Sequence, residues 1–341
     1  MGLTLVASPA AVSSATAQAI AQLTPQRVIE LGGHGVSETL PVVSSVALGR
    51  EGSLLAVVGD DHLVRIVDLR TGRLLHRLSG HTDWVRAVVF RPDGDTLATA
   101  GDDRRIRFWE VSAEQPAGSL PECQQPVYSL AYSPDGQMLG SAGFENKVRI
   151  YDATGRLLRE LAAPGKDIRV VTFSPDGSNV AAAGREGVIR IWETATGRVV
   201  HDLTGPGAAV YALAYSPDGG LLATAGQRGT IRLYSPDSGE PVADLPQRPG
   251  SVLALTFCGG NTLAAGGSDN VIRIWDIASR RQVARLVGHT GSVTTLAFDS
   301  AGGVLVSGSF DTTVRVWQLD DQPKMATNRH GGSRGPVRER Q

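Results

Sequence analysis

The sequence predicts an all-β protein built from seven copies of one repeated unit, and three observations support this. First, an anchor position that is usually aromatic recurs at intervals of 41 or 42 residues. Second, each interval holds short runs rich in β-branched and aromatic residues, which favour strands. Third, turn signals made of Gly, Pro, Asp and Ser separate these runs. The anchors are Val67, Trp109, Tyr151, Trp192, Tyr234, Trp275 and Trp317.

Each unit contains four expected strands in the same order. In the second unit, a run at residues 85–90 is followed by the turn RPDG, the run TLATA, the turn GDDRR and the run IRFW. Pro92 presets φ at the first central position of its turn, and Gly94 supplies conformational freedom. A Thr-Gly or Ser-Gly turn, such as Thr71-Gly72, then opens the fourth strand. Such an antiparallel meander must stack on its neighbours to bury its apolar faces.

Two recurring dipeptides connect these units to a known family. A Gly-His pair such as Gly288-His289 precedes the first strand, and an aromatic residue followed by an acid, such as Trp109-Glu110, ends the third strand. Over residues 26–319 the chain resembles the WD-repeat family, and its turns FSPDG and TATGR resemble those of bacterial WD-repeat proteins. The resemblance implies a seven-bladed β-propeller of four-stranded antiparallel blades around a central channel.

The phase of the repeat predicts how the ring closes. The stretch QRVIELGGH at residues 26–34 matches the outer-strand sequence GRLLHRLSGH at residues 72–81, whereas no equivalent follows Trp317. We therefore expect residues 27–31 to complete the last blade, which removes free sheet edges. The expected organisation is an uncharged N-terminal extension over residues 1–25, the propeller over residues 26–319 and a disordered polar tail over residues 320–341.

The composition narrows the function classes. The formal net charge is −1, so the chain lacks the excess positive charge that is typical of proteins that bind nucleic acid or an anionic membrane. The sequence has only two cysteines, which imply no disulfide framework. It contains no run of 18 apolar residues, the length needed to span a bilayer. We therefore expect a soluble, cytoplasmic protein that binds neither nucleic acid nor membrane. The histidines and cysteines lack metal-ligand spacing, and the sequence has no phosphate-binding loop, so we expect no metal or cofactor.

The polar residues shared by the units raise the question of catalysis. The resemblance implies that the Gly-His histidine, a Ser or Thr of the second strand, the tight-turn Asp and the anchor Trp form one hydrogen-bonded tetrad. A His that bonds both an Asp and a hydroxyl also matches the pattern of a hydrolase triad. We favour a structural role, because in this family the groups lie inside the blade and satisfy one another. The complete tetrads are His81, Thr99, Asp103 and Trp109 in the second unit, and His289, Ser307, Asp311 and Trp317 in the seventh.

The remaining units keep only part of this set. The first unit keeps His34 and Asp61, and the sixth keeps Asp269 and Trp275. The tight-turn position of the third, fourth and fifth units holds Glu145, Glu186 and Arg228. An arginine two residues before each anchor is present in all seven units, and we expect its aliphatic stem to pack on apolar surface.

The predicted function is a non-catalytic scaffold that binds another protein or peptide. Members of the family usually bind partners on the face bearing the Gly-His loops and the tight turns before the third strand. Aromatic and Arg side chains on an exposed rim are typical of binding hot spots. The alternative is a propeller enzyme or small-ligand binder that uses the central channel. The expected partner-binding residues are Trp84, Arg86, Asp102, Tyr128, Phe144, Arg185, Tyr211 and Phe310.

Overall fold

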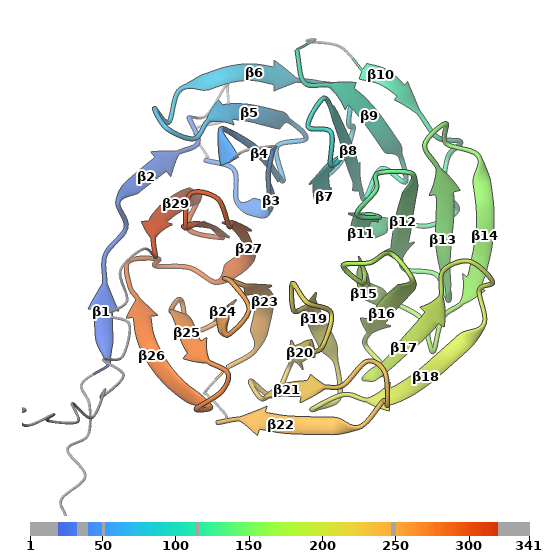
Figure 1. Cartoon of the computed structure of the whole chain (residues 1–341). Helices are drawn as coiled ribbons and strands as arrows, with labels where there is room; N and C mark the ends of the chain where they lie inside the picture. Colours follow the sequence, from blue (N-terminus) through green and yellow to red (C-terminus); the bar gives the residue numbers. More distant parts are fainter. Residues whose placement is uncertain (1–19, 33–39, 50–51, 113–115, 247–249, 320–341) are drawn as a thin grey trace, which may run out of the picture.

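The chain forms a ring of seven β-sheets around a central channel (Figure 1). The computed structural model describes residues 20–32, 40–49, 52–112, 116–246 and 250–319. The expected all-β, seven-bladed propeller is thereby confirmed. The expected tail over residues 320–341 and all of the extension before residue 20 lie outside the described residues.

The first four blades each consist of four consecutive strands, ordered from the channel outwards. Blade 1 contains β3 (Val43–Leu48), β4 (Leu54–Gly59), β5 (Val64–Asp68) and β6 (Leu74–Leu78). Blade 2 contains β7 (Val85–Phe90), β8 (Thr96–Gly101), β9 (Ile106–Glu110) and β10 (Pro116–Ser119). Blade 3 contains β11 (Val127–Tyr132), β12 (Met138–Gly143), β13 (Lys147–Asp152) and β14 (Leu157–Ala162). Blade 4 contains β15 (Ile168–Phe173), β16 (Asn179–Gly184), β17 (Val188–Glu193) and β18 (Val199–Thr204).

The last three blades include the two N-terminal strands, β1 (Ala21–Leu23) and β2 (Arg27–Glu30). Blade 5 contains β19 (Val210–Tyr215), β20 (Leu222–Gly226), β21 (Ile231–Tyr234) and β22 (Pro241–Leu245). Blade 6 contains β23 (Val252–Phe257), β24 (Thr262–Gly267), β25 (Ile272–Asp276) and β26 (Arg281–Leu286), with β1 as an added fifth strand. Blade 7 contains β27 (Val293–Asp299), β28 (Val304–Ser309) and β29 (Thr313–Gln318), with β2 as its outer strand.

The second strand of each blade is buried on both faces, because a neighbouring blade covers each side. This explains its small side chains: β16 reads NVAAAG, and only its first residue is not fully buried. In the outermost strand β18 of the same blade only Leu203 is buried, since one face of this strand meets solvent. Small residues in the second strands let successive blades approach closely.

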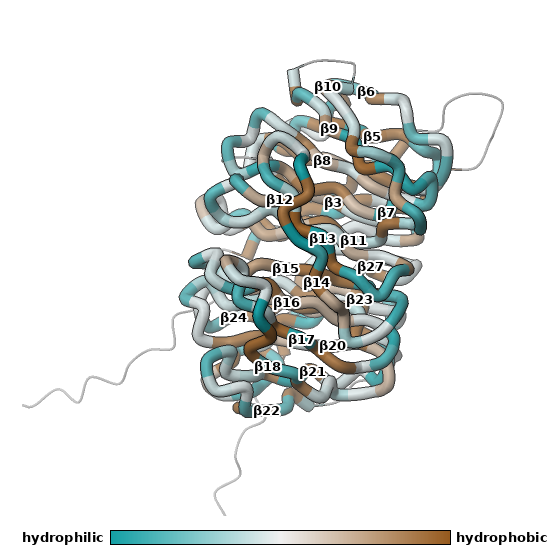
Figure 2. Tube along the Cα trace, turned by 90° about the vertical axis from the view of Figure 1, so that its right-hand side faces the viewer, coloured by the Kyte–Doolittle hydropathy of each residue, from teal (hydrophilic) through white to brown (hydrophobic). Residues whose placement is uncertain are grey.

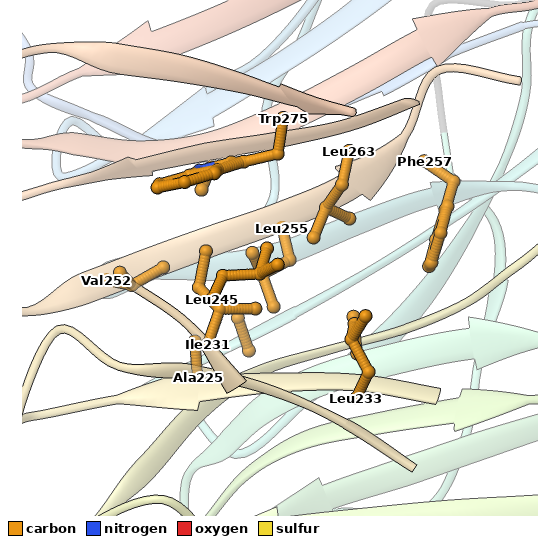
Figure 3. Close-up of a cluster of buried hydrophobic side chains, with 12 residues drawn as sticks. Ala225, Ile231, Leu233, Leu245, Val252, Leu255, Phe257, Leu263 and Trp275 are labelled. Carbon is orange, nitrogen blue, oxygen red and sulfur yellow. The ribbon is translucent and has the colours of Figure 1, made fainter. Parts of the chain in front are cut away.

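The apolar core consists of clusters between adjacent blades. Between blades 5 and 6, the indole of Trp275 packs with Leu245, Leu255 and Leu263 (Figure 3). Burying one such leucine contributes about 1.5–3 kcal/mol relative to leaving it exposed. In side view, apolar segments run through the strands and hydrophilic segments gather at the loops (Figure 2). No single blade contains a complete core, so the ring must close for every blade to be covered.

The N-terminal segment closes the ring as the repeat phase predicts. Strand β2 pairs with β29 in antiparallel register, with Ile29 opposite Val314. The side chains of Ile29 and Leu31 are buried between blades 7 and 1. The sequence analysis did not predict β1, which pairs in parallel with β26 and places Leu23 beside Leu286. The N-terminal segment therefore contacts the last two blades of the ring in succession.

Candidate functional site

The tetrad of blade 2 forms a continuous hydrogen-bonded chain. Nδ1 of His81 lies 2.7 Å from Oδ2 of Asp103, and Nε2 lies 2.7 Å from Oγ1 of Thr99. The indole N–H of Trp109 donates to the same hydroxyl oxygen at 2.7 Å. Because a carboxylate only accepts, Nδ1 of His81 carries the proton and Nε2 accepts from the Thr99 hydroxyl. Each polar side-chain group of this tetrad therefore has a hydrogen-bond partner within the tetrad.

The tetrad of blade 7 repeats this geometry. Nδ1 of His289 lies 2.8 Å from Oδ2 of Asp311, and Nε2 lies 2.7 Å from Oγ of Ser307. The Trp317 indole donates to Ser307 at 2.9 Å. Asp311 also accepts from the hydroxyl of Thr313 at 2.6 Å. The two blades therefore contain the same arrangement, with Ser in place of Thr.

The electrostatics of these tetrads fit a structural role. The side chains of His289 and Asp311 are only 1% and 5% exposed. Burial lowers the pKa of His289, although the Asp311 carboxylate opposes this effect. Burial would raise the pKa of Asp311, but hydrogen bonds from Thr313, from a backbone N–H and from His289 lower it to about 2. A neutral imidazole beside an ionised carboxylate, with both covered by protein, leaves no room for a substrate.

In blades 1, 3 and 6 the tight-turn acid pairs with an arginine. Glu145 in blade 3 and Asp269 in blade 6 each form an ion pair of 2.5 Å with the arginine four residues further on, Arg149 and Arg273. Asp61 in blade 1 pairs with Arg65 in the same way, and His34 lies outside the described residues. These arginines belong to the set that precedes the anchors. Several of them therefore balance a carboxylate of their own blade.

In blades 4 and 5 the corresponding arginines use the outer strand instead. Arg190 pairs with Asp202, and Arg232 pairs with Asp244, each at 2.6 Å. The tight-turn residues Glu186 and Arg228 are both exposed. The structure thus pairs the arginines of these two blades with carboxylates of the fourth strand.

A cavity of about 640 Å³ lies where the loop face meets the channel, and all seven blades contribute to it. We call it the channel mouth. The loop face carries the loops before each first strand and the tight turns before each third strand. Six of the expected partner-binding residues line the cavity directly, namely Trp84, Arg86, Tyr128, Arg185, Tyr211 and Phe310. Asp102 and Phe144 adjoin it through Arg86 and Tyr128.

The second residue of the innermost strand lines the channel mouth in all seven blades, near the loop-face end of the strand. In blades 2 and 4 this residue is Arg, so Arg169 corresponds to Arg86. Sequence reasoning missed Arg169, although alignment of the inner strands could have found it. The complete set is Ser44, Arg86, Tyr128, Arg169, Tyr211, Leu253 and Thr294.

Aromatic rings and guanidinium groups alternate across blades 2, 3 and 4. The Arg86 guanidinium lies 3.7 Å from the ring centre of Trp84 and 5.5 Å from that of Tyr128. The Arg169 guanidinium lies 4.3 Å from Tyr128 and 5.7 Å from Phe144. The rings of Tyr128 and Phe144 are 5.1 Å apart. Such cation–π contacts hold these side chains in place before any partner binds. We call these five residues the aromatic–arginine ladder.

Carboxylates fix the two arginines of the ladder. Arg86 pairs with Asp102 at 2.6 Å, and Arg169 pairs with Asp167 at 2.6 Å. Glycine at the end of the second strand makes this possible: a Cβ on Gly101 would lie 2.1 Å from the carbonyl oxygen of Trp84. The Asp102 N–H donates to that carbonyl at 2.9 Å. The turn is therefore held against the start of the inner strand.

The exposure of the expected residues differs. Phe144 and Phe310 are 42% and 45% exposed, whereas Trp84 is half-buried beneath Arg86. The indole nitrogen of Trp84 is shielded from solvent and has no hydrogen-bond partner among the described residues. Burial raises the pKa of Tyr128, so its hydroxyl stays protonated at neutral pH. The channel mouth therefore offers both exposed rings and a shielded donor.

Other chemistry has little support in the described part of the chain. No group of three or more His, Cys, Asp or Glu side chains there is arranged to hold a metal ion. Burial raises the pKa of Cys258 to about 12 and also raises that of Cys123, so neither is a reactive thiolate. The described residues include no helix that is long and apolar enough to cross a membrane.

Comparisons with known proteins agree with the architecture. The family described as "WD domain, G-beta repeat" matches six stretches, which begin with the outer strand of one blade and end with the third strand of the next. Residues 26–71, which include β2 and most of blade 1, lie outside these matches, although blade 1 has the same four strands. The matched stretches are residues 72–110, 114–152, 155–193, 197–235, 239–276 and 280–318.

Similar curated proteins match over short segments. The Periodic tryptophan protein 2 homolog of Neurospora crassa is 46% identical over 61 residues, 18% of this chain and 7% of that protein. The WD repeat and HMG-box DNA-binding protein 1 of Mus musculus is 41% identical over 63 residues, 18% of this chain and 6% of that protein. Cell division control protein 4 of Saccharomyces cerevisiae is 42% identical over 59 residues, 17% of this chain and 7% of that protein.

These relatives are eukaryotic, so the expected bacterial type is not supported. The turns FSPDG and TATGR follow from strand–turn geometry, which makes them poor markers of origin. The aligned segments are also less than a tenth as long as the relatives. The family itself is clear from the six repeat matches and the seven blades: the chain belongs to the WD-repeat family.

Proposed function

We propose that this chain is a non-catalytic scaffold that binds a partner protein or peptide at the channel mouth on its loop face. The observation that carries the proposal is the aromatic–arginine ladder beside an open cavity. Trp, Tyr and Arg are the residue types that dominate binding hot spots. Here they are held by cation–π contacts and ion pairs, so binding costs little side-chain entropy. The buried tetrads support the non-catalytic part of the proposal.

A double variant tests this function. Trp84→Ala with Phe144→Ala removes the aromatic rings at both ends of the ladder, while the strands keep their cores. We expect the affinity for a partner to fall by about 2 kcal/mol, roughly 30-fold, with little change in stability. The measurement is quantitative capture of partners from a native lysate, followed by titration with the purified partner.

Two exposed apolar residues elsewhere supply the matched control. Leu157 and Val199 are 45% and 41% exposed on the outer strands of blades 3 and 4. The variant Leu157→Ala with Val199→Ala should bind like the wild type. If the ladder variant melts several degrees lower, or captures every wild-type partner equally, the two rings belong to the core and the binding face is left unassigned. Binding of DNA and RNA should be measured with the same variants, because the name of one relative mentions DNA binding.

A further inference from the structure

Resting on the proposed function, we propose that the partner segment bound at the channel mouth is acidic and places an Asp or Glu carboxylate against Arg185. Among the described residues that line the channel mouth, the charged ones are Arg86, Arg169 and Arg185, and none is an acid. The lining is therefore cationic, although the whole chain has a net charge of −1.

The three arginines are not equivalent. Arg86 directs Nε and Nη2 to Asp102, and Trp84 covers one face of its guanidinium. Arg169 is paired with Asp167 at 2.6 Å and lies against Tyr128. Each of these two guanidinium groups has a carboxylate at 2.6 Å, that of Asp102 or of Asp167. Arg86 and Arg169 therefore position the aromatic rings of the ladder and add little net charge to the channel mouth.

Arg185 carries the charge that remains. Its side chain is 71% exposed, and the carboxylate paired with it, that of Asp167, is 3.7 Å away. That carboxylate already pairs with Arg169 at 2.6 Å. One negative charge is thus shared by two guanidinium groups. The Arg185 guanidinium keeps donors that can form a bidentate pair with an incoming carboxylate.

The fold positions Arg185 for this role. It follows the second strand of blade 4, and its N–H donates to the Asp167 carbonyl at 3.2 Å. A Cβ on Gly184 would lie 2.2 Å from that same oxygen, so only glycine lets the turn approach so closely. The backbone of Arg185 is therefore fixed against blade 4, while its side chain extends over the channel mouth.

The rest of the channel mouth suits the flanking part of an acidic peptide. The wall opposite the ladder contains hydroxyl side chains, Ser44, Ser251 and Thr294, and the exposed ring of Phe310. The hydroxyls of Ser44, Ser251 and Thr294 donate to carbonyl oxygens of this chain, so their own oxygens are left to accept from peptide N–H groups. The ring of Phe310 can contact an apolar neighbour of the acid. A volume of about 640 Å³ is within the usual range of ligand cavities. A single unbalanced charge matches one carboxylate better than a doubly charged phosphate.

A peptide library tests the proposal. Random nonapeptides with a fixed central Glu, Gln, Lys or phosphoserine are incubated with the purified full chain, and the best binders are titrated by fluorescence anisotropy. We expect Glu to be preferred over Gln by at least about tenfold, with the preference weakening as salt rises. Arg185→Glu should reverse the preference towards Lys, and Arg185→Gln should abolish it.

Arg198 provides a closely matched control. Its side chain is 69% exposed and lies 3.7 Å from Glu193, but it follows the turn between β17 and β18 on the opposite face. Arg198→Glu makes the same change in net charge and should keep the Glu preference. If Arg185→Glu also keeps it, or if phosphoserine is preferred over Glu, the proposal is wrong.

The two proposals fail in different ways. Peptide binding that shows no Glu preference, yet is lost in the Trp84→Ala, Phe144→Ala variant, overturns the acidic partner and leaves the binding face standing. Binding that this double variant does not change, or a library from which no peptide is enriched, counts against both. Melting temperatures of all variants show whether lost binding reflects lost folding.

Discussion

Blades 2 and 7 contain the same tetrad but differ in how the chain builds them. Blade 2 is one continuous stretch, from β7 to β10. Blade 7 takes three strands from the C-terminal end of the propeller and its fourth, β2, from the N-terminal segment. The distance between His Nδ1 and Asp Oδ2 is nevertheless 2.7 Å in one and 2.8 Å in the other. The tetrad is therefore a property of the inner three strands and the loop before them.

This difference separates two sources of stability. The tetrad organises one blade locally, whereas the outer strand decides whether the ring is closed. Blade 3 shows that the local part can be replaced, because Glu145 there pairs with Arg149 instead of a histidine. No other strand of the described chain can replace β2 at the outer edge of blade 7. We therefore expect perturbations of closure to cost more than perturbations of a tetrad.

The largest expected effect is loss of the closing strand. Deleting residues 1–31 removes β1 and β2. It also removes the buried side chains of Ile29 and Leu31, which exposes the apolar residues of blades 7 and 1 that they cover. Each of these buried side chains contributes about 1.5–3 kcal/mol, so we expect a loss of several kcal/mol. Deleting residues 1–24 removes β1 only and should cost much less. Thermal melting of both truncations checks this, and equal melting temperatures would contradict the assignment of β2 as the closing strand.

A smaller effect is expected for the tetrads. Asp103→Ala and Asp311→Ala each leave a buried histidine without its carboxylate, which should cost about 1–3 kcal/mol. The two losses should be similar, because the tetrads share one geometry. Glu145→Ala in blade 3 should cost less, since Arg149 keeps Glu160 at 3.0 Å. Denaturant unfolding measures all three, and a much larger loss in blade 7 alone would show that chain connectivity does affect the tetrad.

The smallest expected effect is a dependence on pH. The pKa of His289 is lower in the folded protein, so the unfolded chain binds a proton more readily. This contribution to stability is complete above the unfolded value of about 6.5 and is lost as pH falls through the folded value. His289→Gln should therefore lose less stability between pH 7 and pH 5 than the wild type does. His201→Gln, on the outer strand β18, is the control, and an unchanged slope in His289→Gln would refute the argument.

Much of the candidate site was within reach of the sequence, and the missing parts have a common cause. Trp84 and Phe144 stand where sister units have small or polar residues, and Phe310 was expected because it maps to the loop face. Arg169 and its partner Asp167 were missed. A single unit does not reveal that the second residues of all seven inner strands meet at one cavity. That requires the ring to bring the blades together.

By itself the sequence determined the features that repeat along the chain. The 41- or 42-residue period, the four strands per unit and the closing strand follow from local turn chemistry and phase, and the resemblance to the WD-repeat family implied the tetrad members. The tertiary structure decided which side chains meet between blades, including the aromatic–arginine ladder, the shared Asp167 carboxylate and the pairing of β1 with β26. The physical reason is distance: turn and strand preferences act within a few residues, whereas these contacts depend on the closed ring.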